Sequence, residues 1–289
     1  MIAARVCASR RATQRGFTLI ETIMVIVIIG ILGAIVAVFV RAPIQGYVDA
    51  VARAEATDEA DLALRRMARD IRLALPNSVR VNAAGSAIEF LLTRTGGRYL
   101  ADEDEVEGGD TLSFADPADR SFSVVGELME DIQATDAIAV FNLGVPDADA
   151  YEGATIAPVA APVAAGTNPV ITLRANPFAA QPVPMPSPDA RFQVVSGPVS
   201  YVCEAAPAGG FMIRRYSGYA VTRAMAAPPA NARVAVLAAR VTTCANVFRS
   251  DNVAATNAGL VVLALSLGTR NLADPAVRLV HQVHVDNTP

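Results

Sequence analysis

The chain has 289 residues, a formal net charge of −4 and a hydrophobic fraction of 53%. Its 24 basic residues are all arginine and are scattered along the chain, and tryptophan is absent. A nucleic-acid-binding protein should show a basic patch or a positive balance, so this composition argues against that class. Genomic base composition explains the arginine bias more simply.

The first predicted element is an apolar helix over residues 17–40. Its only charged side chain is Glu21, and residues 23–40 carry no charge at all. Such a helix covers about 36 Å, enough for a hydrocarbon core of ~30 Å. A carboxylate inside the membrane costs ~2.5–3.5 kcal/mol on insertion scales, so an ordinary anchor has no use for Glu21.

Two ordinary explanations of this apolar segment stay open, namely a secretory signal peptide and a plain membrane anchor. A secretory signal peptide has an apolar core of ~7–15 residues and a small-residue cleavage site, and the segment before Arg41 is too long and lacks that site. A plain single-span anchor has the right length and remains the stronger of the two alternatives.

The hexapeptide Gly-Phe-Thr-Leu-Ile-Glu at residues 16–21 follows a short basic leader and opens the apolar helix. It resembles the class III signal of type IV pilins and of the pseudopilins of type II secretion. The resemblance implies that a prepilin peptidase removes residues 1–16 by cutting between Gly16 and Phe17, and that Phe17 is then methylated. It also implies that Glu21 neutralises the N-terminal amine of a neighbouring subunit in a fibre. Opposite charges excluded from water attract strongly, and neither is tolerable alone.

Charge also predicts the orientation. Four arginines precede the apolar helix, namely Arg5, Arg10, Arg11 and Arg15. The positive-inside tendency keeps this leader in the cytoplasm and places the chain after Arg41 in the periplasm. We therefore expect a single-pass protein of the bacterial inner membrane that later enters a fibre. Its expected partners are the prepilin peptidase, other minor and major pilins and the inner-membrane assembly platform.

The cysteines agree with an oxidising compartment. Cys7 would be lost with the leader, which leaves Cys203 and Cys244. An even pair in the periplasm favours a disulfide, worth about 4 kcal/mol in the chain-entropy model. Two free buried thiols, or half of a metal site, remain as alternatives, although no further Cys or His lies at zinc-type spacing.

A second, amphipathic helical stretch is predicted over residues 41–76. Pro43 and Gly46 should interrupt the helix, because proline removes a backbone donor and clashes with the preceding turn. Apolar residues then recur every three or four positions, so this stretch should lie against a sheet. Pro76 and Asn77 should end it.

Residues 77–289 change to short β-type runs separated by Gly, Pro and Asp. We predict an α+β, pilin-like fold in which the long helix packs on a mostly antiparallel β domain. Residues 156–163 and 176–188 are rich in proline and are expected to be extended surface loops, because proline cannot donate to a central ladder. The predicted strands are 78–82, 87–92, 111–114, 122–125, 137–143, 170–173, 192–195, 199–203, 211–216, 241–248, 260–267 and 277–285.

A narrower resemblance concerns the globular part. Residues 64–80, Asn142-Leu143-Gly144, Ala150-Tyr151 and the ending at 281–287 resemble J-type pseudopilins and the O-type minor pilins of mannose-sensitive haemagglutinin (MSHA) pilus biogenesis. The resemblance implies an accessory subunit that primes the fibre tip.

Residues that could carry chemistry are few. The acidic run from Asp102 to Asp110 could offer calcium ligands, but its order does not match an EF-hand loop and a solvated loop is the simpler interpretation. His281 and His284 should point to opposite faces of a strand, which disfavours a shared metal. No nucleophile elbow, Walker loop or zinc-helix motif occurs, so we expect no catalytic residue, no cofactor and no enzyme activity.

Three functions remain to be compared. The first is an assembly role as a minor pilin or pseudopilin, and the second is a tip-displayed adhesin or binding module whose loops contact a ligand. The third is an anchored periplasmic enzyme that uses the helix only as a tether.

Overall fold

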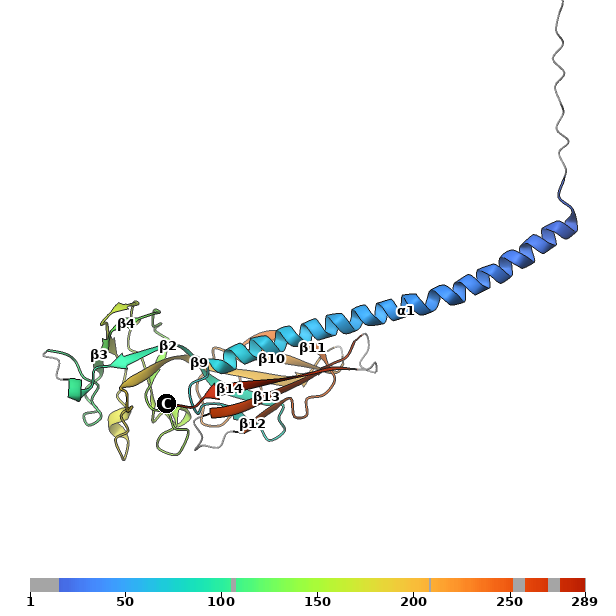
Figure 1. The fold of residues 1–289 in the computed structure, drawn as a ribbon. Helices are drawn as coiled ribbons and strands as arrows, with labels where there is room; N and C mark the ends of the chain where they lie inside the picture. The colour runs from blue at the N-terminus through green and yellow to red at the C-terminus, as the bar shows by residue number, and fades with distance from the viewer. Residues whose placement is uncertain (1–15, 105–107, 208, 252–257, 270–275, 289) are drawn as a thin grey trace, which may run out of the picture. The chain divides into compact units, whose positions relative to one another are not determined.

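The computed structural model describes residues 16–104, 108–207, 209–251, 258–269 and 276–288 (Figure 1). The chain divides into a first unit that ends at Val51 and a second that begins at Ala52. The predictions for leader residues 1–15 and for the centre of the acidic run lie outside the described residues.

Helix α1 (Leu19–Arg72) passes through Pro43 without a break. The predicted interruption at Pro43 and Gly46 is therefore wrong. A proline removes one backbone hydrogen bond, and the remaining bonds of a 54-residue helix keep the segment helical.

The helix also ends earlier than predicted. After Arg72 the chain turns to bond with a strand: the Leu75 amide donates to the Leu91 carbonyl at 2.7 Å, and the Thr93 amide donates to the Leu73 carbonyl at 2.8 Å. The backbone leaves the helix before Pro76 because this edge of the sheet supplies other partners for its polar groups.

The β domain is antiparallel in every described strand pair, which confirms the predicted α+β class. The main sheet runs in the order β12-β13-β11-β10-β9-β2-β3-β8, and β14 pairs with β13. The strands are β1 (Arg80–Val81), β2 (Ala87–Tyr99), β3 (Ser121–Val125), β4 (Glu127–Leu128), β5 (Ala137–Ala139), β6 (Ile156–Pro158), β7 (Gly166–Thr167), β8 (Val170–Thr172), β9 (Arg191–Ala205), β10 (Phe211–Ser217), β11 (Arg233–Val241), β12 (Phe248–Asp251), β13 (Ala258–Leu267) and β14 (Val277–Asp286). Short 3-10 helices are η1 (Asp102–Asp104), η2 (Ala150–Glu152) and η3 (Phe178–Ala180).

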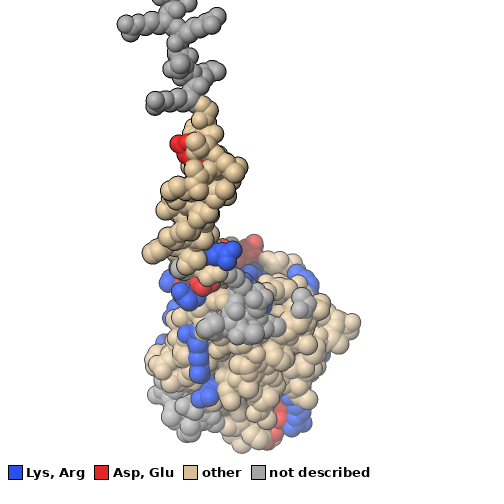
Figure 2. Space-filling model, turned by 90° about the vertical axis from the view of Figure 1, so that its right-hand side faces the viewer, with Lys and Arg blue, Asp and Glu red and all other residues tan. Residues whose placement is uncertain are grey.

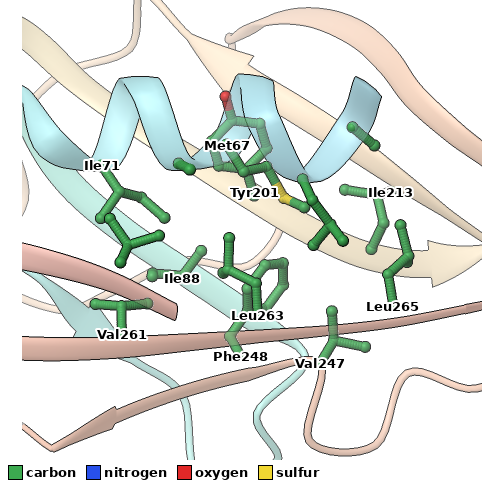
Figure 3. Packing of buried hydrophobic residues seen from close by; sticks show 14 of the residues in the cluster. Met67, Ile71, Ile88, Tyr201, Ile213, Val247, Phe248, Val261, Leu263 and Leu265 are labelled. Carbon is green, nitrogen blue, oxygen red and sulfur yellow. The ribbon is translucent and has the colours of Figure 1, made fainter. Parts of the chain in front are cut away.

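The main core lies between the C-terminal part of α1 and this sheet. Figure 3 shows Met67 and Ile71 of the helix packed against residues of the strands, among them Ile88, Tyr201 and Leu263. All five side chains are fully buried. The predicted packing of the amphipathic stretch against a sheet is thus observed within the second unit.

A smaller lobe grows from the far end of two long strands. β2 and β9 pair from Ala87 to Arg98, and the Tyr99 amide donates to the Ala190 carbonyl at 2.8 Å where the strands part. The chain between these two residues builds most of a second core around Phe122, Phe178 and Phe192. Figure 1 shows this lobe around β3 and β4.

Several predicted strands differ in the structure. Residues 111–114 form no strand, and residues 241–248 are mainly the connection between β11 and β12. The missed strand β11 has small or exposed residues through most of its length, so it lacks the alternating pattern of a half-buried strand. The predicted strands 192–195 and 199–203 are one strand, β9: Gly197 and Pro198 stay paired with Leu92 and Leu91, and a bulge at Ser196 shifts the register without ending the strand.

The first proline-rich segment is not a surface loop. Residues 156–158 form β6 against β5, and Ala157 and Val159 are fully buried in the core of the lobe. The second segment, 176–188, is attached at both ends, because Phe178 and Ser187 are buried. Its middle, around the 63% exposed Val183, lies at the surface.

Candidate functional site

The candidate site is the beginning of helix α1, where the processing motif lies. Leu19 is the first helical residue and Thr18 precedes it. The Thr18 hydroxyl accepts from the Glu21 amide at 3.4 Å, and the Thr18 carbonyl accepts from the Thr22 amide at 3.2 Å. Thr18 thus caps the helix, and a threonine followed three residues later by glutamate has the spacing of a capping box.

This cap was missed by the sequence reasoning, although the Thr-x-x-Glu spacing could have predicted it. It gives Glu21 a local role, because a carboxylate in the first turn interacts favourably with the helix dipole. No side chain in the described parts of the chain pairs with the Glu21 carboxylate, so its negative charge has no side-chain counter-ion there.

The predicted cleavage point is open. Phe17 is 82% exposed, and a Cβ placed on Gly16 would meet nothing within 4 Å. The fold of the chain therefore does not require glycine at position 16. A strict requirement for Gly16 would have to come from an enzyme that binds this segment.

The N-terminal part of α1 is apolar and exposed on all sides. Its best 18-residue window has a mean hydropathy of 3.3 and no buried residue. Figure 2 shows this part as a nearly uniform tan column with one acidic patch. Length and composition allow the helix to cross a membrane, and an exposed apolar surface of this extent needs lipid or other helices around it.

The C-terminal part of α1 is tied to the sheet by two carboxylates. Glu59 accepts from the Ala239 amide and from the Arg240 guanidinium, each at 2.7 Å. Asp70 accepts from the Tyr201 hydroxyl at 2.7 Å and from Arg215 at 2.8 Å. These bonds place the helix in a defined register on the sheet.

The two remaining cysteines lie together, and a disulfide joins Cys203 to Cys244 with a Cα–Cα distance of 5.4 Å. Cys203 belongs to β9, and Cys244 lies in the connection between β11 and β12. The bond ties this connection to the middle of the sheet.

The motifs of the narrower resemblance meet at one place, directly after α1. The side-chain amide nitrogen of Asn77 donates to the Asn142 backbone carbonyl at 2.9 Å and to the Asn287 backbone carbonyl at 3.2 Å. Asn142 in turn donates to the Pro76 carbonyl at 2.6 Å, and the Tyr151 hydroxyl donates to the Ser78 carbonyl at 3.0 Å. Three segments far apart in sequence are thus hydrogen-bonded around the helix end, which no sequence spacing indicated.

The other candidates for chemistry are not assembled into a site. Asp104 accepts from Arg98 at 2.5 Å and from the Ala101 amide at 2.9 Å, and these bonds lower the pKa of its carboxyl. No group of three metal-binding side chains occurs among the described residues. His281 and His284 alternate in β14, where His284 is exposed and His281 lies on the partly buried face. Calcium in the acidic run stays an untested prediction.

Comparison with known proteins gives one match. Residues 11–37 match the family model of the prokaryotic N-terminal methylation motif. No curated protein and no solved structure matches the chain significantly. The matched segment contains the exposed Gly16, the capped helix start and the apolar half of α1, and it supports a type IV pilin-like protein that a prepilin peptidase processes.

Proposed function

We propose that this chain is a minor pilin of an MSHA-type type IV pilus, matured by cleavage after Gly16 and N-methylation of Phe17. It then leaves the inner membrane to join a fibre, where it helps to prime the tip. The observation that carries the proposal is Glu21, a carboxylate without a side-chain partner among the described residues, in an exposed apolar helix. A neighbouring subunit's N-terminal amine would supply the counter-ion.

The experiment separates the charge of Glu21 from its capping role. Glu21→Gln keeps a residue suited to the capping box but removes the charge. Thr18→Ala removes the cap but keeps the charge. We expect both variants to be cut, and only Glu21→Gln to lose most of its incorporation into fibres.

Processing is measured by the mass of the mature N-terminus, and incorporation by the amount of the chain in sheared fibres. Gly16→Val is the matched control for cleavage and should leave the precursor intact. Full incorporation of Glu21→Gln would disprove the counter-ion role, and an intact wild-type precursor in cells that mature other pilins would disprove the whole proposal.

A J-type pseudopilin of type II secretion is the alternative within the same class. Deleting the gene should then reduce protein secretion while pilus number stays normal, whereas the minor-pilin proposal expects the reverse. Both alternatives treat the chain as a structural subunit and not as an enzyme.

The separate core of the lobe favours a binding module as a second candidate function. The exposed middle of its proline-rich segment, Pro182, Val183 and Pro184, can be replaced by Ser-Gly-Ser without touching the buried Phe178 and Ser187. Loss of surface attachment at an unchanged fibre number would favour the adhesin. Unchanged attachment would argue against a role for this loop.

A further inference from the structure

The lobe contains an open cavity of about 360 Å³, close to the point where β2 and β9 part. Preformed hollows of this size, with apolar walls and a few polar groups, are typical of sites that bind a ligand. We call it the lobe cavity. Its lining includes two aromatic rings, a set of prolines and two carboxylates, among them Tyr99, Phe114, Pro184, Pro186, Asp102 and Glu103.

The prolines of the lobe cavity form a rigid part of its lining. Pro184, Pro186 and Pro188 all line it, two residues apart, which is the spacing of side chains on one side of an extended segment. The segment is held by the buried Ser187, whose amide donates to the Tyr99 hydroxyl at 3.1 Å. Because proline has a fixed φ, a ligand would lose little binding energy to ordering this wall.

An aromatic side chain supplies a second flat surface. Phe114 is half-buried, and its ring centroid lies 5.9 Å from that of Tyr99 and 6.2 Å from that of Phe178. These contacts hold the ring in place, while its remaining surface lines the lobe cavity. Flat rings stack on planar groups, so the lining suits a planar ligand better than a rounded one.

The charged groups of the lobe cavity are acidic. Asp102 and Glu103 both line it and are exposed. Neither has an ion-pair partner among the described residues. Arg98, which lines an adjoining cavity of about 730 Å³, bonds to Asp104 at 2.5 Å and attracts Glu103 only through the weaker effect of its charge. A cationic ligand would therefore supply a counter-charge for these two carboxylates.

We propose that the lobe cavity binds an arginine side chain of a partner polypeptide. A guanidinium is planar, so it can stack on Phe114 and on the proline rings, and its forked N–H groups match a carboxylate such as Glu103. A lysine ammonium has the same charge but is compact and strongly hydrated, so it fits a flat apolar lining less well. All 24 basic residues of this chain are arginine, and a partner with the same residue usage would present arginine too.

This binding goes beyond the proposed function and does not depend on it. The lobe cavity lies wholly within the second unit, so cleavage after Gly16 leaves its lining unchanged. Calcium at the same two carboxylates would behave differently, because calcium needs several more oxygen ligands and makes no use of an aromatic ring.

The test uses the full chain in an uncharged detergent and three peptides of alanine and proline that differ in their central residue. That residue is arginine, lysine or citrulline, and citrulline keeps the planar shape of arginine without its charge. The NMR signals of each peptide are followed as the chain is added, with detergent alone as the blank. We expect the arginine peptide to bind with a Kd below ~1 mM and the other two to bind at least ~5-fold more weakly, because each lacks either the charge or the planar shape.

Substitutions in the chain test which side chains bind the peptide. Asp102→Asn with Glu103→Gln should weaken binding of the arginine peptide about tenfold, because charge-assisted hydrogen bonds are lost. Phe114→Leu keeps an apolar residue but removes the ring, and it should weaken binding about threefold. The matched control is Glu130→Gln, which neutralises another exposed acid of the lobe that does not line the cavity, and it should change nothing.

Three outcomes would overturn the proposal: equal binding of the three peptides, full binding to the chain without the Asp102 and Glu103 charges, or no binding of the arginine peptide. In the last case, calcium binding measured with calcium chloride alone would assign the two carboxylates to a metal. If Phe114→Leu also lowers the free energy of unfolding, the lysine and citrulline peptides still decide the question on the wild-type chain. Cleavage after Gly16 is measured separately, by the mass of the N-terminus, so failure of the proposed function is told apart from failure of the cavity to bind.

Discussion

The two parts of helix α1 have the same backbone conformation, but their side chains suit different surroundings. The described side chains from Leu19 to Val51 are exposed on every side of the helix, and most of them are apolar. From Ala52 to Arg72 one face is buried in the core and the other is charged. The first part therefore depends on surroundings outside the chain, whereas the second is stabilised by the chain's own sheet.

The largest expected change in stability should distinguish the two parts of α1. Ile71→Ala removes a fully buried side chain, and we expect the free energy of unfolding of the β domain to fall by about 2–5 kcal/mol. Ile28→Ala removes a similar side chain that is 51% exposed in the first unit, and it should leave this free energy unchanged. Denaturant unfolding of the full chain in detergent measures both. Equal effects would show that the first part also stabilises the domain.

The two carboxylates that bind the second part of α1 to the sheet should contribute different amounts to the free energy of unfolding. Asp70 and Arg215 have side chains that are only 12% and 19% exposed, so Asp70→Ala should cost about 3 kcal/mol. Glu59 and Arg240 are 26% and 41% exposed, and Glu59→Ala should cost about 1 kcal/mol. The same unfolding measurement ranks the two variants. A larger loss at Glu59 would mean that its bond to the Ala239 amide outweighs burial.

Alkaline pH should loosen the contact between the helix and the sheet. Burial, followed by the nearby Asp70 charge, raises the pKa of the Tyr201 hydroxyl above its usual value of about 10. The folded state therefore holds this proton more tightly than the unfolded state. The protonated Tyr201 hydroxyl therefore contributes fully to stability below pH ~10, and this contribution is lost as the pH rises through the pKa of the folded state.

The measurement is the free energy of unfolding at pH 8 and at pH 11. Tyr201→Phe should be less sensitive to this change than the wild type. An identical pH dependence in both proteins would assign the alkaline loss to other tyrosines, such as the buried Tyr151 and the partly buried Tyr219, whose pKa values burial also raises.

The smallest effect is expected at Leu62, which lies on the second part but is 71% exposed. Leu62→Ser should change the free energy of unfolding by less than ~0.5 kcal/mol, as surface substitutions usually do. A large loss of stability would show that Leu62 packs on the β domain and does not face solvent.

Much of the fold could be predicted because its signals are local. The apolar run, the amphipathic spacing before Arg72 and the alternating residues of β13 and β14 each lie within one continuous segment. The class α+β followed from these signals and is confirmed. The helix cap at Thr18 was equally local and was overlooked.

The errors concern features that depend on distant partners. Residues 111–114 have strand-forming side chains but form no strand, whereas β11 pairs along β10 despite a poor pattern. The segment 156–163 contains prolines, yet Ala157 and Val159 fill the core of the lobe. In each case tertiary packing outweighed local propensity.

The processing motif, the apolar helix behind it and the change from helix to strands could all be predicted from the amino-acid sequence, because a few neighbouring residues encode each of them. The meeting of Asn77, Asn142 and Asn287 at the end of the helix, in contrast, is visible only in the folded chain. The same holds for the bonds that Glu59 and Asp70 accept from arginines of the sheet. Hydrogen-bond partners and burial arise from contacts between distant segments, and these exist only after the chain has folded.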